Sequence, residues 1–516
     1  MPPDLNLNLS PLNLNSPGLL PFLKHARTHI LPTFRNGIVT QSPIYVLGNQ
    51  SADLDSIISA ILYSYFFSRS GDSGKRGYVP LVNLPDVPSG PELRRLRPEF
   101  ACALELSVSS SSTTLSMQNN KPGKEKDGED GIVKLLREHI ITVSDLREGL
   151  SPSPDVDQEE MKTKKLELDC VMVDWNNLPH KSRPDGKEEG KGSIDGLSDL
   201  ATFTVNGCID HRPDEGFVPP LERLPQGNPR VIISGPGSCT SLIVREIRER
   251  GLWPSSTSSV TEGHGQQQLN DEAGEEGKWE VQLAKLALAS ILIDTTNLTA
   301  EGKVTDVDRD AVSFLTERIS SFSAGGAGEW GRTAYFEQIQ YAKAHSLDWL
   351  TVDEIMGRDY KDWTESSPSS GEKRVVGIAS VVRPLKWIVD KARNKDDDST
   401  NIGGDELKLF LDKLMKFALE RRLDVVSVMT AFGSEDGDGE GQFSRELLVW
   451  GLKDAYNDTL ANFAETSKEQ LGLQKWNDFP IEGSHEYTGG LYIWQQGNVS
   501  QSRKQVAPLL RQAFTN

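Results

Sequence analysis

The sequence predicts an α/β protein of two domains: an N-terminal domain with a mostly parallel sheet and a smaller C-terminal α/β domain with a mixed sheet. Through the first 320 residues, apolar strand-like runs alternate with helix-like segments, a pattern typical of a parallel sheet with crossover helices. A Gly- and Ser-rich segment follows at 320–331, and a second mixed pattern begins after it. We therefore expect a disordered tail at 1–35, a first domain at 36–322 and a second at 333–516.

The individual elements follow from the apolar runs and the turn residues between them. In the first domain we expect strands at 44–47, 168–175, 204–210 and 230–234, and helices at 56–67 and 241–250. Three segments rich in Ser, Gly, Gln and charge are expected to be flexible insertions: 107–131, 181–199 and 254–277. In the second domain we expect strands at 375–382, 424–432, 445–451 and 490–494, helices near 405–422, 452–465 and 502–514, and loops at 364–373 and 433–441.

Composition restricts the function classes. The 516 residues carry a formal net charge of −19, which argues against a general nucleic-acid binder because phosphate backbones are captured by surplus Lys and Arg. No apolar run is long enough to span a membrane, and the N-terminus lacks the pattern of a signal peptide. The four cysteines are far apart and form no CxxC pair. We expect a cytoplasmic protein with reduced cysteines and no membrane partner.

Acidic residues recur at the ends of apolar runs. Asp53 and Asp55 follow the strand at 44–47, Asp174 and Asp210 each end a strand-like run, and Asp294 follows the aliphatic run LAKLALASILI. Each could be a helix cap or a turn residue taken singly. Together they favour a shared metal site at the carboxyl ends of the strands, where open α/β sheets place their ligands.

Oxygen-rich sites of this kind suit Mg²⁺ and Mn²⁺. Two such cations about 3.5–4 Å apart can hold a phosphoryl group and its attacking water. His211 could add one imidazole ligand, although a single histidine is more often a hydrogen-bonded structural residue. The sequence thus favours two divalent cations, Mg²⁺ first and Mn²⁺ as the alternative, and metal-assisted hydrolysis of a phosphate ester or anhydride.

Basic residues near the C-terminus are candidates for phosphate binding. Arg503 and Lys504 begin a helix-like segment, where free backbone N–H groups already favour anions, although they could also be an ordinary solvated pair. The segment Gly235–Ser241 lies between a strand and a helix but lacks the GxxxxGK[ST] pattern of a nucleotide-binding loop. We interpret its Ser238 and Thr240 as structural residues of a tight turn and helix cap.

Four motifs in the first domain resemble those of the DHH phosphoesterase superfamily in content and order. They are GNQSADLDS at 48–56, VMVDW at 171–175, CIDHR at 208–212 and ILIDT at 291–295. RDYKDW at 358–363 and SRKQVAP at 502–508 resemble the DHH-associated C-terminal domain of family II inorganic pyrophosphatases, exopolyphosphatases and prune proteins. The resemblance spans residues 40–515, and the Asn in the first motif is most similar to the exopolyphosphatase and prune branch.

The resemblance implies a role for each motif residue, with the active site in the interdomain cleft. Asp53 and Asp55 would each bind one metal, Asp174 and Asp294 would bridge both, and His211 would bind the second metal. Asn49 stands where pyrophosphatases carry a metal-binding His, and Asp210 would orient the ring of His211. Arg212, Lys361, Arg503 and Lys504 would hold the substrate phosphates, with Arg383 a weaker candidate; Asp174, Arg212, Lys361 and Lys504 would form the catalytic set.

The implied activity is release of orthophosphate from the end of inorganic polyphosphate. Inorganic pyrophosphate, short-chain polyphosphate and cyclic nucleotides are alternative substrates. Arg212 can hold phosphate bidentately but cannot release a proton near pH 7, so the identity of the general acid stays open. The competing hypotheses are a DHH-fold binding protein with little activity and, less favoured because of the SRKQ motif and the net charge, a single-strand exonuclease. Protein partners do not follow from the sequence.

Overall fold

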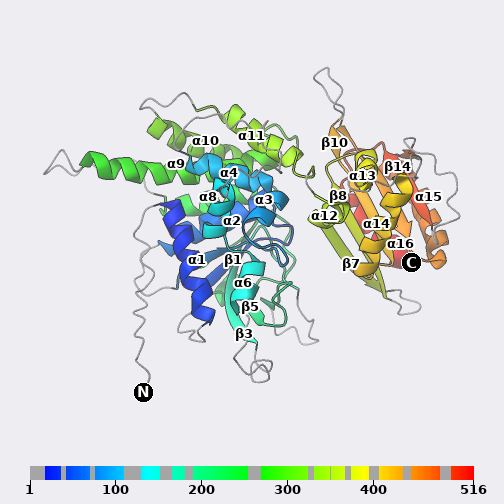
Figure 1. Cartoon of the computed structure of the whole chain (residues 1–516), viewed down its shortest axis with the longest axis horizontal. Helices are drawn as coiled ribbons and strands as arrows, with labels where there is room; N and C mark the ends of the chain where they lie inside the picture. The colour runs from blue at the N-terminus through cyan, green and yellow to red at the C-terminus, as the bar shows by residue number, and fades with distance from the viewer. Residues whose placement is uncertain are drawn as a thin grey trace. The chain divides into compact units, whose positions relative to one another are not determined.

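A computed structural model shows that the chain divides into two units between Ser346 and Leu347, each with its own sheet and core (Figure 1). We call residues up to Ser346 unit 1 and those from Leu347 unit 2. The structure describes residues 18–35, 42–69, 76–109, 130–150, 165–179, 190–253, 269–323, 330–348, 350–366, 373–393, 406–433, 443–476 and 490–515. Among them, no helix is both long enough and apolar enough to cross a membrane.

The sheet of unit 1 has the order β2-β1-β3-β5, with β4 and β6 both paired to β5. Its strands are β1 (Ile44–Leu47), β2 (Tyr78–Leu81), β3 (Leu166–Val173), β4 (Lys191–Gly192), β5 (Ala201–Asp210) and β6 (Arg230–Ile232). All its pairs are parallel except β4 with β5. The carboxyl ends of β1, β3, β5 and β6 therefore meet at one edge of the sheet.

Helices cover both faces of this sheet (Figure 1). They are α1 (Leu19–Arg35), α2 (Leu54–Ser68), α3 (Pro91–Leu96), α4 (Pro98–Val108), α5 (Gly131–His139), α6 (Val143–Leu150), α8 (Cys239–Glu249), α9 (Leu269–Asp294), α10 (Asp306–Ser323) and α11 (Arg332–Ala344), with a short 3₁₀ turn at Leu221–Arg223. Successive strand residues point to opposite faces, so Val46 packs with α2, α8 and α9 while Tyr45 packs with α6. The strands are consequently apolar on both sides.

The sheet of unit 2 has the order β13-β14-β12-β9-β8-β7 and is mixed, because only β8 and β9 run parallel. Its elements are α12 (Val352–Arg358), β7 (Tyr360–Ser366), β8 (Lys373–Val381), α13 (Leu385–Ala392), α14 (Glu406–Glu420), β9 (Val425–Thr430), β12 (Glu446–Gly451), α15 (Asn457–Leu471), β13 (Leu473–Lys475), β14 (Leu491–Gln496) and α16 (Arg503–Thr515), with a small hairpin of β10 (Phe432–Gly433) and β11 (Phe443–Ser444) and a 3₁₀ turn at Asp454–Tyr456. Apolar residues of α15 and α16 pack against one face of the sheet, and α12, α13 and α14 also bury apolar residues.

Several expected boundaries are wrong. Within the predicted disordered tail, α1 is a helix whose Leu19, Phe22 and Leu23 are buried; residues 1–17 lie outside the described residues. Helix α11 packs on α4 and α9, so unit 1 ends after α11 and not before it. Residues 269–277 of the predicted third insertion belong to α9, and 364–366 of a predicted loop belong to β7. In the second predicted insertion, residues 190–199 are described and contain the short strand β4, whereas most of each other insertion or loop lies outside the described residues.

Candidate metal centre

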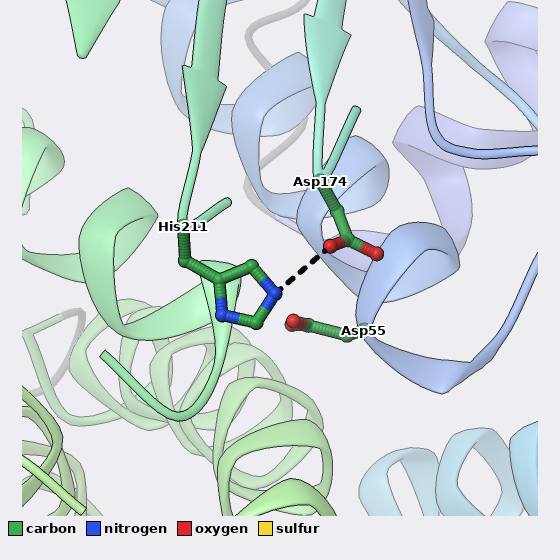
Figure 2. Close-up of side chains that lie close together, drawn as sticks. All are labelled: Asp55, Asp174 and His211. Atoms are coloured by element: carbon green, nitrogen blue, oxygen red, sulfur yellow. Dashed lines mark ion pairs between the residues drawn. The ribbon is translucent and has the colours of Figure 1, made fainter. Parts of the chain in front are cut away.

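Asp55, Asp174 and His211 converge at the carboxyl edge of the sheet in unit 1. Asp55 lies in the first turn of α2, Asp174 directly follows β3, and His211 directly follows β5. Each offers one potential ligand atom, and these atoms lie within 4.8 Å of one another (Figure 2). Two carboxylates and an imidazole are a donor set that can hold a divalent cation.

Asp174 is the most constrained of the three residues. It is fully buried and has a φ of 54°, a left-handed conformation that Asp adopts more readily than most residues. Its Oδ2 accepts hydrogen bonds from Asn49 Nδ2 at 2.8 Å and Ser56 Oγ at 2.7 Å. Its Oδ1 accepts no hydrogen bond and lies 3.2 Å from His211 Nε2. A buried carboxylate needs compensating charge, which ion pairs with His211 and Arg212 supply here and a bound cation could supply in their place.

Arg212 partly neutralises this carboxylate. Its Nη2 lies 3.0 Å from Asp174 Oδ1, and its Nη1 donates a 2.7 Å hydrogen bond to the Asp174 backbone carbonyl. The pKa of Asp174 is raised to about 6, because burial and the nearby charge of Asp53 together outweigh the lowering effect of the Arg212 charge. In this structure the guanidinium therefore lies against the same oxygen that faces His211.

The ring of His211 is oriented by a backbone carbonyl. Nδ1 lies 2.9 Å from the Pro236 carbonyl, which can only accept, so Nδ1 carries the proton and Nε2 faces the carboxylates. The prediction that Asp210 orients this ring is wrong: Asp210 accepts instead from Asn176 Nδ2 at 2.5 Å and from the Arg212 backbone N–H at 3.3 Å. Asp210 thus stabilises the turn that follows β5.

The pKa of His211 rises to about 10. Burial alone would lower it, but the close contact with the Asp174 carboxylate and the negative charge of Asp55 outweigh burial. A metal ion would compete with this proton for Nε2, because only neutral imidazole binds metal.

Asp55 is held against the N-terminus of α8. Its Oδ1 accepts from Ser238 Oγ at 2.8 Å, from Thr240 N and Oγ1 at 2.9 and 2.7 Å, and from Ser290 Oγ at 2.8 Å, and its Oδ2 accepts from Cys239 N at 2.6 Å. Burial would raise the pKa of Asp55, yet the charge of His211 and these hydrogen bonds lower it on balance. The carboxylate is thereby kept ionised.

The sequence did not reveal this use of Ser238 and Thr240, which it indicated only as turn and cap residues. Their segment lies between β6 and α8 and is fixed from the other side by Asp308, whose Oδ2 accepts from Gly237 N at 2.9 Å and whose Oδ1 accepts from Ser241 Oγ at 2.7 Å. A Cβ at Gly237 would lie 2.7 Å from the Lys303 carbonyl, so only glycine fits. The available signal was the position of GPGSCTS between a strand and a helix.

Asp53 and Asp294 lie outside the converging set in the described structure. Asp53 is the N-cap of α2, with Oδ1 accepting from Ser56 N at 3.0 Å, which is the cap role weighed for it. Asp294 is the last residue of α9, so its aliphatic run is helical. Burial, followed by the charge of Asp55, raises the pKa of Asp294 well above its ordinary value. Mutual repulsion among neighbouring carboxylates is relieved by bound cations.

The expected phosphate-binding residues of the C-terminal part lie in unit 2. Lys361 is on β7 and exposed, and Lys504 is exposed in the first turn of α16. Arg503 donates to Asp359 through Nη1 to the carbonyl at 2.9 Å and Nη2 to Oδ1 at 2.8 Å. Arg383 lies over the ring of Trp387. Their roles in substrate binding stay predictions.

Comparison with known proteins supports the resemblance. Residues 337–513 match the DHHA2 domain. The chain is 28% identical over 496 residues to a Schizosaccharomyces pombe protein named "Putative exopolyphosphatase", covering 95% of this chain and 96% of that protein. It is 21% identical over 489 residues to "Exopolyphosphatase PRUNE1" of Bos taurus, covering 93% of this chain and 78% of that protein. The resemblance therefore extends over nearly the whole chain.

Proposed function

We propose, on the premise that the chain belongs to the exopolyphosphatase and prune branch of the DHH superfamily, that it is a metal-dependent hydrolase of phosphoanhydride bonds. The proposed reaction releases orthophosphate from the end of inorganic polyphosphate. The observation that carries the proposal is the convergence of Asp55, Asp174 and His211, each with one potential ligand atom within 4.8 Å of the others, on a buried Asp174 carboxylate. This arrangement suits a hard divalent cation, Mg²⁺ first and Mn²⁺ as the alternative.

In this proposal Asp55, Asp174 and His211 hold one cation, and Asp53 and Asp294 complete the ligand set of a second. Divalent cations bound there would supply a hydroxide nucleophile near neutral pH and neutralise phosphate charge. Asn49 and Ser56 fix Asp174 through its Oδ2, which leaves Oδ1 to face the ligand. Pro236 keeps the proton of neutral His211 on Nδ1, so Nε2 is free to coordinate.

Arg212 is proposed to exchange partners during the reaction. In the structure its guanidinium pairs with Asp174. Once a cation neutralises that carboxylate, the guanidinium can turn to a substrate phosphate and bind it bidentately. Lys361, Arg503, Lys504 and Arg383 are proposed to hold the remaining phosphates. The net charge of −19 favours short chains over long ones, since it repels an extended polyanion.

A second candidate function is supported by one observation. The pairing of Arg212 with Asp174 already compensates the central carboxylate without metal. A DHH-fold binding protein with little catalytic activity would have this property. The two functions differ in whether a divalent cation displaces the guanidinium and whether hydrolysis follows.

The test is hydrolysis of pyrophosphate, tripolyphosphate, long-chain polyphosphate and cyclic AMP with Mg²⁺, with Mn²⁺ and with EDTA. Asp174→Asn keeps the shape of the side chain and removes its charge. It should lower metal-dependent turnover by more than the roughly 10- to 100-fold expected for a group that merely supports a metal ligand.

Asp145→Asn is the matched control, because Asp145 is another buried carboxylate of unit 1 that accepts from Thr142 N at 3.0 Å. It should lower thermal stability and leave the activity of the folded fraction unchanged. Metal-dependent activity that survives in Asp174→Asn would contradict the proposed centre, and absence of hydrolysis with every substrate would favour the binding protein.

A further inference from the structure

A buried arginine lies behind the loop that carries the first motif. Arg97 is 3% exposed and lies at the junction of α3 and α4, where the sequence pointed to no functional residue. Its Nε donates a 2.8 Å hydrogen bond to the Ala52 carbonyl, and its Nη2 donates to the Ser51 carbonyl. One guanidinium thus binds two consecutive carbonyls of the loop between β1 and α2.

The loop that Arg97 contacts has a strained conformation. Ala52 has a φ of 44°, a left-handed value that is unfavourable for a residue with a Cβ. The turn is closed by the Ala52 N–H, which donates to the Asn49 carbonyl at 3.0 Å. A second buried side chain, Asn83, donates from Nδ2 to the Gly48 carbonyl at 3.1 Å. The strained turn is therefore held by side chains from outside it.

The same turn positions two of the three residues of the centre, Asp174 and Asp55. At its start, Asn49 donates to Asp174 Oδ2; at its end, Asp53 caps α2, whose first turn carries Asp55. A change in the φ of Ala52 would move these residues relative to one another. Guanidinium is suited to preventing this, because its rigid planar fork can bind two acceptors at once, whereas the ammonium of Lys is a single point charge.

We propose that Arg97 is a positioning residue of the metal centre: by holding the Ser51 and Ala52 carbonyls it fixes the strained turn, and this sets the affinity of the centre for divalent cations. The inference deepens the proposed function and rests on it. Arg97 acts through the turn and touches neither cation nor substrate.

The test measures binding of Mn²⁺ alone, without substrate, to the full-length protein by electron paramagnetic resonance. Arg97→Lys should weaken Mn²⁺ binding by about 10- to 100-fold, as expected for groups that support metal ligands. It should lower kcat at subsaturating Mn²⁺, with activity recovered at high Mn²⁺ and the KM for substrate unchanged.

Arg27→Lys is the matched control, since Arg27 is partly buried and, like Arg97, donates to a backbone carbonyl, that of Ile140; it also donates to Asp145. It should lower stability and leave Mn²⁺ affinity unchanged. Ala52→Gly in the Arg97→Lys background should recover part of the affinity, because glycine adopts positive φ without strain. If Arg97→Lys alone folds poorly, the Mn²⁺ affinity of this double variant is measured in its place.

Equal Mn²⁺ affinity in Arg97→Lys and wild type, or an equal loss in Arg27→Lys, would overturn the positioning role while leaving the proposed function intact. Failure of the wild-type protein to bind Mn²⁺ would instead remove the proposed metal centre, and this inference with it.

Discussion

At the residue scale, the centre consists of charged side chains whose burial is unfavourable and whose contacts with opposite charges compensate that cost. Asp174 is buried beside His211 and Arg212, so one carboxylate faces two cationic groups. The pKa of His211 near 10 means that the metal-free centre holds imidazolium at neutral pH. The sign of the resulting pH dependence follows from this shift.

The first prediction concerns the stability of the protein in EDTA. The folded pKa of His211 lies above its unfolded value of 6.5, so its stabilising contribution is complete below pH 6.5 and is lost as pH rises through about 10. Between these limits the free energy of unfolding should fall by up to about 1.4 kcal/mol per pH unit from this group. Urea unfolding of wild type and His211→Gln across pH 6.5–10 measures it.

His211→Gln should have a flatter profile, because glutamine does not titrate. Parallel profiles for the two proteins would show that the imidazolium does not stabilise the metal-free fold. Asp174 titrates at lower pH, because its pKa is raised only from 3.8 to about 6. Its effect on the free energy of unfolding is therefore nearly complete below the pH range in which His211 titrates.

At the element scale, the N-terminus of α8 orients and ionises Asp55. Two backbone N–H groups and three hydroxyls converge on this carboxylate, and the segment leading to α8 is itself fixed by Asp308. The helix start therefore selects the charged form of Asp55, as backbone N–H groups at a helix N-terminus do for anions in general.

Thr240→Val tests this use of α8. The substitution keeps the branched shape and the backbone N–H but removes the Oγ1 donor at 2.7 Å from Asp55 Oδ1. The pKa of Asp55 should rise, and Mn²⁺ binding should weaken by about tenfold. Calorimetric titration with Mn²⁺ measures the affinity.

Thr142→Val is the control, because the buried Thr142 Oγ1 accepts from Asp145 N at 3.1 Å at the start of α6. It should lower the melting temperature without changing Mn²⁺ affinity. The same loss of affinity in both variants would mean that the effect on Asp55 is a general loss of stability.

Much of the element scale was accessible from the sequence. The strands at 44–47 and 204–210 and the helices at 56–67 and 241–250 are present, because apolar runs of strand or helix length bounded by Gly, Pro and Asp are local signals. The helical state of the aliphatic run before Asp294 was not accessible from the sequence, because a run of this kind fits a buried helix or a strand equally well. Arg97 was missed because its partners are backbone carbonyls some 45 residues away along the chain.

At the scale of the whole molecule, each unit has a sheet and a core of its own. In unit 2, one core cluster consists of sheet residues with α15 and α16, and α12, α13 and α14 bury further apolar residues. The N-terminal helix α1 belongs to the core of unit 1. The match to the DHHA2 domain begins at residue 337, within α11, although α11 packs on α4 and α9 of unit 1. The family boundary and the structural boundary thus differ by part of one helix.

The final prediction is that a fragment of residues 347–516 folds on its own and unfolds in a single cooperative transition. A fragment of residues 333–516 should be less soluble, because it exposes the Tyr335, Ile339 and Ala342 side chains that α11 buries against unit 1. Circular dichroism during heating and the soluble fraction after expression compare the two. Higher solubility of the longer fragment would assign α11 to unit 2.

The sequence by itself determined the two α/β parts, the positions of acidic residues at the ends of strands and the family resemblance, because these depend on local periodicity and on short motifs. Only the tertiary structure decided that Asp55, Asp174 and His211 converge, that Pro236 and not Asp210 orients the histidine, and that Arg97 fixes the first motif. These contacts join residues far apart in the chain. Their geometry depends on how strands and helices pack, which no local pattern encodes.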